Sequence, residues 1–136
     1  MNVLLYAFRP DAERHREYYA WLQDIVDDPA PYGMAPQALA AVLRIATHSR
    51  AFARPYERDD VLAFAEDLLS RANCVAITPG VRHWSIFVRI SRESGASGSL
   101  VQDAWWAALA MESGCEWISA DRDFARFPGL HWRPPF

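Results

Sequence analysis

The sequence has few of the residues that build disulfide frameworks or zinc sites. Its two cysteines, Cys74 and Cys115, lie far apart and form no CxxC pair, which fits a reducing cytoplasm. Its histidines are scattered, so the spacing typical of zinc ligands is missing. They are His15, His48, His83 and His131. We therefore expect a cytoplasmic protein without a zinc site.

The sequence also lacks the segments that would direct it to a membrane. No apolar run approaches the roughly 20 residues that a membrane-spanning helix requires. No basic start precedes an apolar run with a small-residue cleavage site, so a signal peptide is not expected. The glycine–serine stretch at residues 94–98 lacks the lysine of a Walker motif, so it does not indicate a nucleotide-binding loop.

An excess of positive charge is missing as well. Lysine and arginine together number 14 against 17 acidic residues, which gives a net charge of −3. This balance argues against broad electrostatic affinity for nucleic acid. A nuclease remains compatible with it, because a bound cation and a local basic patch can do that work. The length of 136 residues, 51% of them hydrophobic, predicts a single globular domain over 1–136.

The most informative stretch runs from residue 99 to residue 127. Ser99 and Gln102 have the spacing of a capping box, and apolar residues then recur with the period of a helix. Gly114 is suited to ending that helix in a left-handed conformation. A short strand is predicted over 115–118, and Asp121 and Asp123 follow it.

This pattern brings carboxylates together if it forms the second half of a βαβ unit. Asp103, in the first turn of the helix, and Asp121, just after the strand, then meet at the carboxyl edge of the sheet. Carboxylates repel unless a proton or cation lies between them, and an oxygen-only cluster suits Mg²⁺ or Mn²⁺. Two simpler interpretations stay open. The helix dipole alone favours Asp103, and Asp121 can be an N-cap for the following residues.

The remaining elements can be placed from periodicity and from proline and glycine. Residues 2–8 are continuously apolar, and so short a run does not distinguish a strand from a helix. The predicted helices cover 11–28, 37–48, 57–72 and a segment that starts at Pro79 and breaks at 94–98. The predicted short strands cover 32–35, 74–77 and 130–132.

Two motifs in the C-terminal quarter carry a family resemblance. The first reads SLVQDAWWAALA, with Val101, Asp103, Ala104, Ala107, Ala108, Leu109 and Ala110 at the matching positions. The second reads SADRDFARF, with Ser119, Asp121, Asp123, Phe124, Arg126 and Phe127 matching. Two further matches are NVLLYA at 2–7 and LRIATH at 43–48. Together they resemble PIN-domain ribonucleases, in particular the VapC toxins of bacterial toxin–antitoxin pairs.

The resemblance implies an α/β, PIN-like domain with a short parallel sheet flanked by helices. It implies an endoribonuclease that depends on Mg²⁺ or Mn²⁺, hydrolyses cellular RNA, forms a homodimer and is inhibited by a VapB-type antitoxin. Asp103 and Asp121 would be direct metal ligands. Asp123 would bind a second metal or hold a metal-bound water, while Arg44 and Ser119 would contact the substrate.

Two positions depart from the family pattern. In the family, an Asp that binds metal lies two residues before the Asn of NVLLYA, at the end of a central first strand. Here Met1 directly precedes Asn2, so the first strand is truncated; we expect a misassigned start, because losing a central strand would leave backbone groups unpaired. A helical Glu that many PIN nucleases use as a ligand is replaced by Ala41.

These departures keep rival interpretations open. One is a catalytically impaired homologue that only binds its antitoxin. The other is a phosphatase or receiver-like α/β protein, which would need a nucleophilic Asp at the end of strand one.

Three smaller features have a structural and a functional interpretation. The sequence has a basic cluster of Arg44, His48, Arg50 and Arg54. These residues can contact phosphate, or they can simply lie at a solvent-exposed helix end, where cations complement the helix dipole. His83 is expected to be a surface or hydrogen-bonded core residue. Trp105 and Trp106 cannot both face inward on one helix, so we expect one to be buried and the other exposed at a dimer surface.

Overall fold

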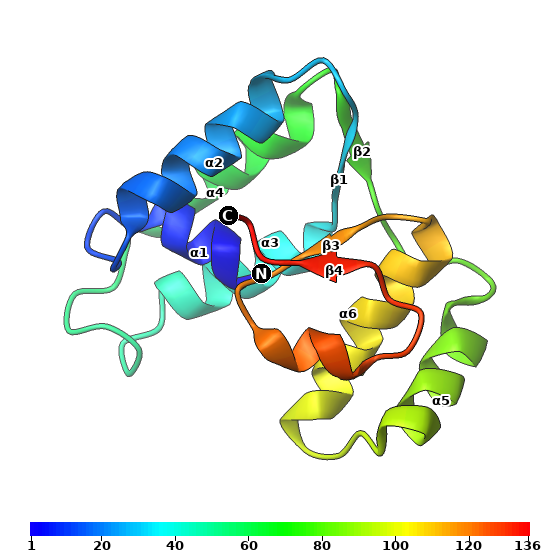
Figure 1. Ribbon diagram of the computed structural model, residues 1–136. Coiled ribbons are helices and arrows are strands. Elements are labelled where there is room, and N and C mark those ends of the chain that lie inside the picture. Colours follow the sequence, from blue (N-terminus) through cyan, green and yellow to red (C-terminus); the bar gives the residue numbers. More distant parts are fainter. The chain divides into compact units, whose positions relative to one another are not determined.

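The computed structural model describes residues 1–136, and the chain divides into two compact units (Figure 1). Unit 1 comprises Met1–Ala76 with Phe136, and unit 2 comprises Ile77–Pro135. Six α-helices, one 3₁₀ helix and four short strands make up the chain, and both strand pairs are parallel. The predicted α/β class, with short parallel strands and flanking helices, is confirmed. None of the helices combines the length and apolar character needed to cross a membrane.

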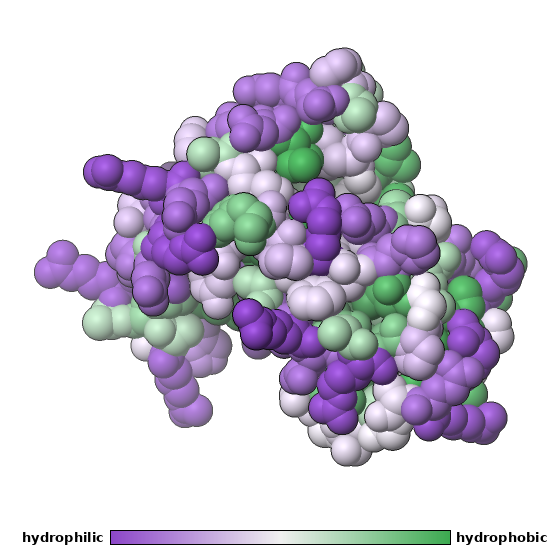
Figure 2. All heavy atoms as spheres, viewed as in Figure 1, coloured by the Kyte–Doolittle hydropathy of each residue, from purple (hydrophilic) through white to green (hydrophobic).

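Unit 1 is built mainly from four helices. They are α1 (Asn2–Phe8), α2 (His15–Asp27), α3 (Pro36–Ala46) and α4 (Arg58–Ser70). The apolar run at the start of the chain, which the sequence left undecided, is a helix that packs against α2 and α3. Its buried side chains lie in the hydrophobic core. Over α2, hydrophilic side chains predominate on the face shown in Figure 2, as expected for an amphipathic helix.

The helix α2 begins four residues later than the sequence predicts. Arg14 adopts a left-handed conformation with φ of 59° immediately before it, and a non-glycine residue in that region interrupts a right-handed helix. Asp11, the predicted start, instead pairs with Arg9. The bounds of α3 and α4 lie within two residues of the prediction, which is the usual uncertainty of helix ends.

The strands of unit 1 are β1 (Tyr32–Met34) and β2 (Cys74–Ala76), with Gly33 opposite Val75. Side chains tie this pair to its helices. The Tyr32 hydroxyl donates to the Leu68 carbonyl at 2.6 Å. The Asn73 amide donates to carbonyls at the end of α2, the shortest bond being 2.6 Å to Asp28. These bonds satisfy carbonyl groups at and just beyond the C-terminal ends of α4 and α2, which have no partner within their own helix.

Unit 2 contains α5 (His83–Ser94) and α6 (Ser99–Ser113), which lie side by side and are joined by a short glycine-containing loop (Figure 1). It also contains β3 (Trp117–Ile118), the 3₁₀ helix η1 (Arg122–Arg126) and β4 (Trp132–Arg133). The strands β3 and β4 pair in parallel, and η1 packs against α6.

The predicted start of α5 at Pro79 is wrong, because the helix begins at His83. The segment before it is fixed by a residue from another helix. The Glu112 carboxylate accepts the backbone N–H groups of Gly80 at 2.7 Å and Arg82 at 2.9 Å. These bonds lower the pKa of Glu112, with the Gly80 N–H contributing most. A tertiary contact thus holds Pro79 outside the helix.

The predicted capping box at the start of α6 is also wrong. Gly98 is the N-cap, with φ of 57°, and no side chain caps the helix. Ser99 is therefore the first helical residue, and Asp103 lies just beyond the first turn rather than in it. The glycine supplies a positive φ that serine would adopt only with strain, so the turn geometry outweighs the capping pattern.

The predicted end of α6 is confirmed. Gly114 has φ of 66° and ψ of 24°, and its N–H bonds to the Met111 carbonyl. The next N–H, from Cys115, bonds to the Ala110 carbonyl at 3.0 Å. This pair of bonds is a Schellman motif, which satisfies the last carbonyls of the helix.

The core of unit 2 contains two of the residues singled out in the sequence. His83 is buried, and its Nε2 lies 3.0 Å from the Trp105 carbonyl oxygen, so the prediction of a hydrogen-bonded core histidine is confirmed. Trp106 is buried, whereas Trp105 is only half-buried and packs on the His83 ring. The expected buried tryptophan is therefore Trp106, whereas Trp105, expected to be exposed as its counterpart, is only partly exposed because His83 of α5 packs on its ring.

Replacing Gly114 by Ala should destabilise the protein by about 1 kcal/mol, because alanine is strained in the left-handed region. No atom lies within 4 Å of the added Cβ, so the loss would come from backbone conformation alone. Urea unfolding measures it. Gly114→Asn should lose less, since asparagine tolerates this conformation, and Ser113→Ala should change little. Equal stability of Gly114→Ala and the unmutated protein would contradict this account.

Candidate functional site

Three aspartates gather in unit 2. Asp103 projects from α6, and Asp121 and Asp123 come from the segment after β3. One carboxylate oxygen of each lies within 4.8 Å of the others. The sequence predicted that Asp103 and Asp121 would meet and, through the family resemblance, that Asp123 would take part in metal binding; the structure brings all three together.

The turn that carries Asp121 is fixed by the buried Ser119. The Ser119 N–H donates to the Arg133 carbonyl at 3.2 Å, and its hydroxyl accepts the Asp121 N–H at 3.1 Å. The Trp132 indole N–H donates to the Ser119 carbonyl at 3.1 Å. Strand β4 therefore sets the direction in which the chain leaves β3. The contacts of Ser119 in the structure are those of a residue that shapes the turn, and its contact with substrate stays a prediction.

Asp121 does act as an N-cap. It precedes η1, and its Oδ1 accepts the Asp123 N–H at 2.9 Å. This bond involves one carboxylate oxygen, so the cap and a metal-ligand role are compatible. The bond also fixes the direction of the Asp121 side chain relative to Asp123, which brings both carboxylates to the same side of the turn.

The third carboxylate is the most exposed of the group. Asp123 lies 3.8 Å from the Arg126 guanidinium, and both side chains are more than half exposed. An ion pair of this kind is screened by water and contributes little to stability. Asp123 can therefore exchange this partner for a cation at small cost.

Burial and repulsion act together on Asp103. The side chain is half-buried, and this burial, followed by the charges of Asp121 and Asp123, raises its pKa. The folded state thus holds the Asp103 proton more tightly than the unfolded state does. The metal-free protein should accordingly lose stability as the pH rises from 3.8, the ordinary value, towards the raised pKa.

The donor set fits a hard divalent cation. All three groups are carboxylates, and no histidine or cysteine belongs to the cluster. Oxygen-only sites suit Mg²⁺ and Mn²⁺, whereas zinc prefers nitrogen and sulfur. Burial and the neighbouring charges raise the pKa of Asp103, and a divalent cation at this position would favour the ionised carboxylate against both.

Arg44 and Ala41, two further positions of the family pattern, lie in unit 1. Arg44 is exposed in the last turn of α3 and forms no ion pair. Ala41 is half-buried on the same helix. The sequence gives no sign that Trp132 fixes Ser119. Its indole bond spans 13 residues of sequence, and no local pattern encodes such a contact.

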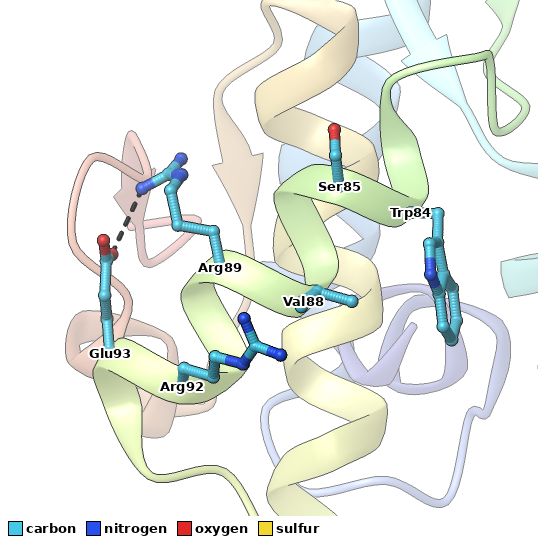
Figure 3. Close-up of a pocket in the computed structure, with 6 residues that line it drawn as sticks. All are labelled: Trp84, Ser85, Val88, Arg89, Arg92 and Glu93. Atoms are coloured by element: carbon cyan, nitrogen blue, oxygen red, sulfur yellow. Dashed lines mark hydrogen bonds and ion pairs between the residues drawn. The ribbon is translucent and has the colours of Figure 1, made fainter.

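A hollow on α5 is separate from the aspartate cluster. Figure 3 shows its lining, with Arg89 paired to Glu93 at 3.1 Å and Trp84 standing apart at the other end. The lining residues are Trp84, Ser85, Val88, Arg89, Arg92 and Glu93. Only one carboxylate is present, and it is already paired, so the hollow is not a metal site.

Comparison with known proteins identifies the family. The model of the PIN domain matches residues 1–130. The chain belongs to the PIN domain family, as its motifs predicted.

Named relatives extend over nearly the whole chain. Ribonuclease VapC43 of Mycobacterium tuberculosis is 37% identical over 135 residues, which are 99% of this chain and 92% of that protein. Ribonuclease VapC25 of the same organism is 37% identical over 136 residues, which are 99% of this chain and 96% of the relative. VapC ribonuclease Mb2897 of Mycobacterium bovis is 37% identical over 135 residues, covering 99% and 92%. The predicted resemblance to VapC ribonucleases is confirmed.

Asp103→Asn should stabilise the metal-free protein and weaken its response to Mn²⁺. The substitution removes a half-buried charge that Asp121 and Asp123 repel, and it also removes a ligand. A cation at 100 times its dissociation constant stabilises a folded protein by about 2.7 kcal/mol. Thermal unfolding with and without MnCl₂ measures both effects.

The matched control is Asp24→Asn, an exposed aspartate of α2 outside the cluster. Its stability and its Mn²⁺ response should equal those of the unmutated protein. If Asp103→Asn responded to Mn²⁺ as strongly as this control, the cluster would not be the metal site.

Proposed function

We propose that this chain is a metal-dependent endoribonuclease, the toxin of a toxin–antitoxin pair, which hydrolyses phosphodiester bonds in cellular RNA. The observation that carries the proposal is the gathering of Asp103, Asp121 and Asp123 within 4.8 Å in a member of the PIN family. Relatives that are named ribonucleases match nearly the whole chain and support the same assignment.

Each residue of the cluster has a role in the proposed reaction. Asp103 and Asp121 would hold Mg²⁺ or Mn²⁺, and Asp123 would hold a second ion or orient a water molecule. The bound ion would supply a nucleophilic water at neutral pH and neutralise charge on the phosphate. Ser119 holds the Asp121 backbone and so keeps the ligands in place, while Arg44 would contact a phosphate of the RNA.

The gathered carboxylates also favour an enzyme over a homologue that only binds its antitoxin. Like charges held together disfavour the folded state. An antitoxin arginine between Asp103 and Asp121 would offset the charge of two of them, whereas a divalent cation would offset the repulsion among all three. The replacement of the family's helical Glu by Ala41 removes one ligand. Three carboxylates remain, and an ordinary Mg²⁺ site takes one or two together with water and phosphate oxygens.

Further parts of the proposal concern assembly and place. We include a cytoplasmic location, one functional domain over 1–136, and a homodimer. The start of α5 offers a surface for self-association, because Trp84 is 68% exposed and Val81, just before the helix, is fully exposed. Exposed apolar side chains of this size are typical of interaction surfaces.

Asp121→Asn should leave the fold intact and abolish RNA cleavage. Asparagine caps helices about as well as aspartate, so η1 should persist, but the neutral amide is a much weaker ligand for a divalent cation. Circular dichroism reports the fold, and incubation of labelled RNA with Mn²⁺ reports cleavage. Persistent cleavage would mean that Asp121 acts only as a cap. Asp24→Asn again provides the control and should cleave normally.

A VapB-type antitoxin is the proposed partner, and its chemistry follows from the charge of the cluster. An inhibitor that only imitated RNA would be repelled by Asp103 and Asp121 when no cation is bound. An arginine can instead bind carboxylates in bidentate fashion. We therefore infer that the antitoxin inserts an arginine-bearing segment between these two aspartates and displaces the cation.

Antitoxin binding and Mn²⁺ binding should then compete. By linkage, each should weaken the other by the same factor. Calorimetric titration of the protein with an antitoxin peptide at several Mn²⁺ concentrations measures this factor. An affinity that did not change with Mn²⁺, together with normal binding by Asp103→Asn and Asp121→Asn, would place the partner elsewhere.

A further inference from the structure

Unit 1 contains a basic segment without any acidic residue. The chain has no lysine, so all 14 of its basic residues are arginines. From Pro29 to Tyr56 the sequence contains neither Asp nor Glu, although it contains Arg44, Arg50 and Arg54. In a chain with a net charge of −3, this segment concentrates positive charge locally.

The three arginines of this segment are also uncommitted. Most arginines of the chain form ion pairs or hydrogen bonds, such as Arg71 with Asp67 and Arg133 with Glu116. Arg44, Arg50 and Arg54 are exposed, and their guanidinium groups have no partner. Exposed guanidinium groups without an internal partner are available to an anionic ligand.

Arg50 and Arg54 lie on the connection between α3 and α4, which we call the α3–α4 loop (residues 47–57; Figure 1). It has no regular secondary structure, yet its backbone is hydrogen-bonded. The N–H of Arg50 donates to His48 Nδ1 at 3.0 Å, and the N–H of Ala51 donates to the His48 carbonyl at 2.9 Å. The N–H of Tyr56 donates to the Ala46 carbonyl at 2.9 Å. The loop is therefore anchored at both ends.

A cluster at the end of α1 holds the middle of the loop. The Arg9 guanidinium lies 4.0 Å from the centre of the Phe52 ring and makes two bonds to Asp11, at 2.9 and 3.3 Å. The Tyr56 hydroxyl donates to the same Asp11 carboxylate. These bonds lower the pKa of Asp11 to about 2, with Arg9 contributing most. The Arg9–Asp11 ion pair thus holds the loop at two points, Phe52 and Tyr56.

With Phe52 packed against Arg9, the loop exposes positive charge but little apolar surface. Arg9 is neutralised by Asp11, and Phe52 is half-buried against Arg9. The exposed positions between the arginines are small, with Ala51 and Ala53 next to Phe52. Protein interfaces depend on large anchors in desolvated pockets, which this loop does not offer. Isolated guanidinium groups on a fixed backbone are instead typical of contacts with phosphate.

We propose that the α3–α4 loop is a preformed binding element for the phosphate backbone of single-stranded RNA, with Arg50 and Arg54 as the contacting residues and Arg9, Asp11 and Tyr56 as positioning residues. The identity of the ligand as RNA depends on the proposed function. A loop fixed before binding loses less conformational entropy on binding. Phosphate contacts carry no base specificity, so the loop contributes affinity rather than a cleavage sequence.

The test uses the full chain with Asp121→Asn, so that RNA is bound but not cut. Binding of a fluorescent oligouridine is measured by anisotropy at several salt concentrations. Each phosphate contact contributes roughly 0.7 to the slope of log K against log salt for a single strand. Arg50→Gln and Arg54→Gln should each lower the slope by about that amount. Arg16→Gln, an exposed and unpaired arginine of α2, should leave it unchanged.

The positioning residues need a different readout. Tyr56→Phe removes the hydroxyl that bonds to Asp11 but keeps the ring, and should weaken RNA binding about fivefold, the equivalent of one hydrogen bond. It should not change the salt slope, because no phosphate contact is lost. The affinity is measured at a temperature where Tyr56→Phe is fully folded. If Tyr56 only stabilised the fold, the substitution would lower the unfolding temperature but leave the affinity for RNA unchanged.

The results distinguish failure of the loop proposal from failure of the proposed function. Unchanged salt slopes in Arg50→Gln and Arg54→Gln, or no RNA binding at all, would overturn the loop proposal. Loss of antitoxin binding with unchanged RNA binding would also overturn it and assign the loop to a protein partner. Cleavage by the chain without Asp121→Asn is measured in parallel. If it persists while the slopes are unchanged, only the loop proposal fails, and if it is absent, the proposed function fails.

Discussion

The burial of α6 is the constraint on which the aspartate cluster depends. Ala104, Ala107 and Ala108 are completely buried, and such small side chains let neighbouring elements pack closely against the helix. The position of Asp103 follows from that of Ala104, its neighbour on the helix. Because Asp103 is thereby half-buried and held near Asp121 and Asp123, its ionisation is disfavoured, first by burial and then by repulsion. The free energy gained by burying α6 must offset the cost of keeping these carboxylates together. Such locally unfavourable groups are common at functional sites.

The net charge of −3 conceals two segments of opposite character. The acidic cluster lies in unit 2, whereas the uncommitted arginines are concentrated in unit 1. In each case, bonds between distant parts of the sequence hold the charged groups. Trp132 and Arg133 fix Ser119 next to Asp121, and Arg9 with Asp11 holds Tyr56. Neutral or internally paired residues thus position the side chains that are free to bind ions or phosphate.

Local patterns gave most of the elements but erred where a tertiary contact intervened. The periodicity of apolar residues located the six helices except the run at 2–8, which it could not classify. Proline at position 79 looked like a helix start, yet Glu112 binds the backbone of the following residues and delays α5 to His83. Ser99 looked like a cap, yet the loop geometry gave that place to Gly98. In each case a longer-range requirement outweighed a local preference of about 1 kcal/mol.

The sequence by itself determined the family, the α/β class and the meeting of Asp103 with Asp121, because the motifs and their spacing are local properties. The βαβ unit assumed around α6 does not form, since β3 pairs with β4 and not with a strand before the helix. The sequence also determined the left-handed end of α6 at Gly114, where one residue type suffices. Only the tertiary structure decided that Ser119 turns its hydroxyl to the backbone of Asp121 and that Tyr56 meets Asp11. The partners of these side chains are chosen by the packing of whole elements, and no pattern of neighbouring residues encodes that choice.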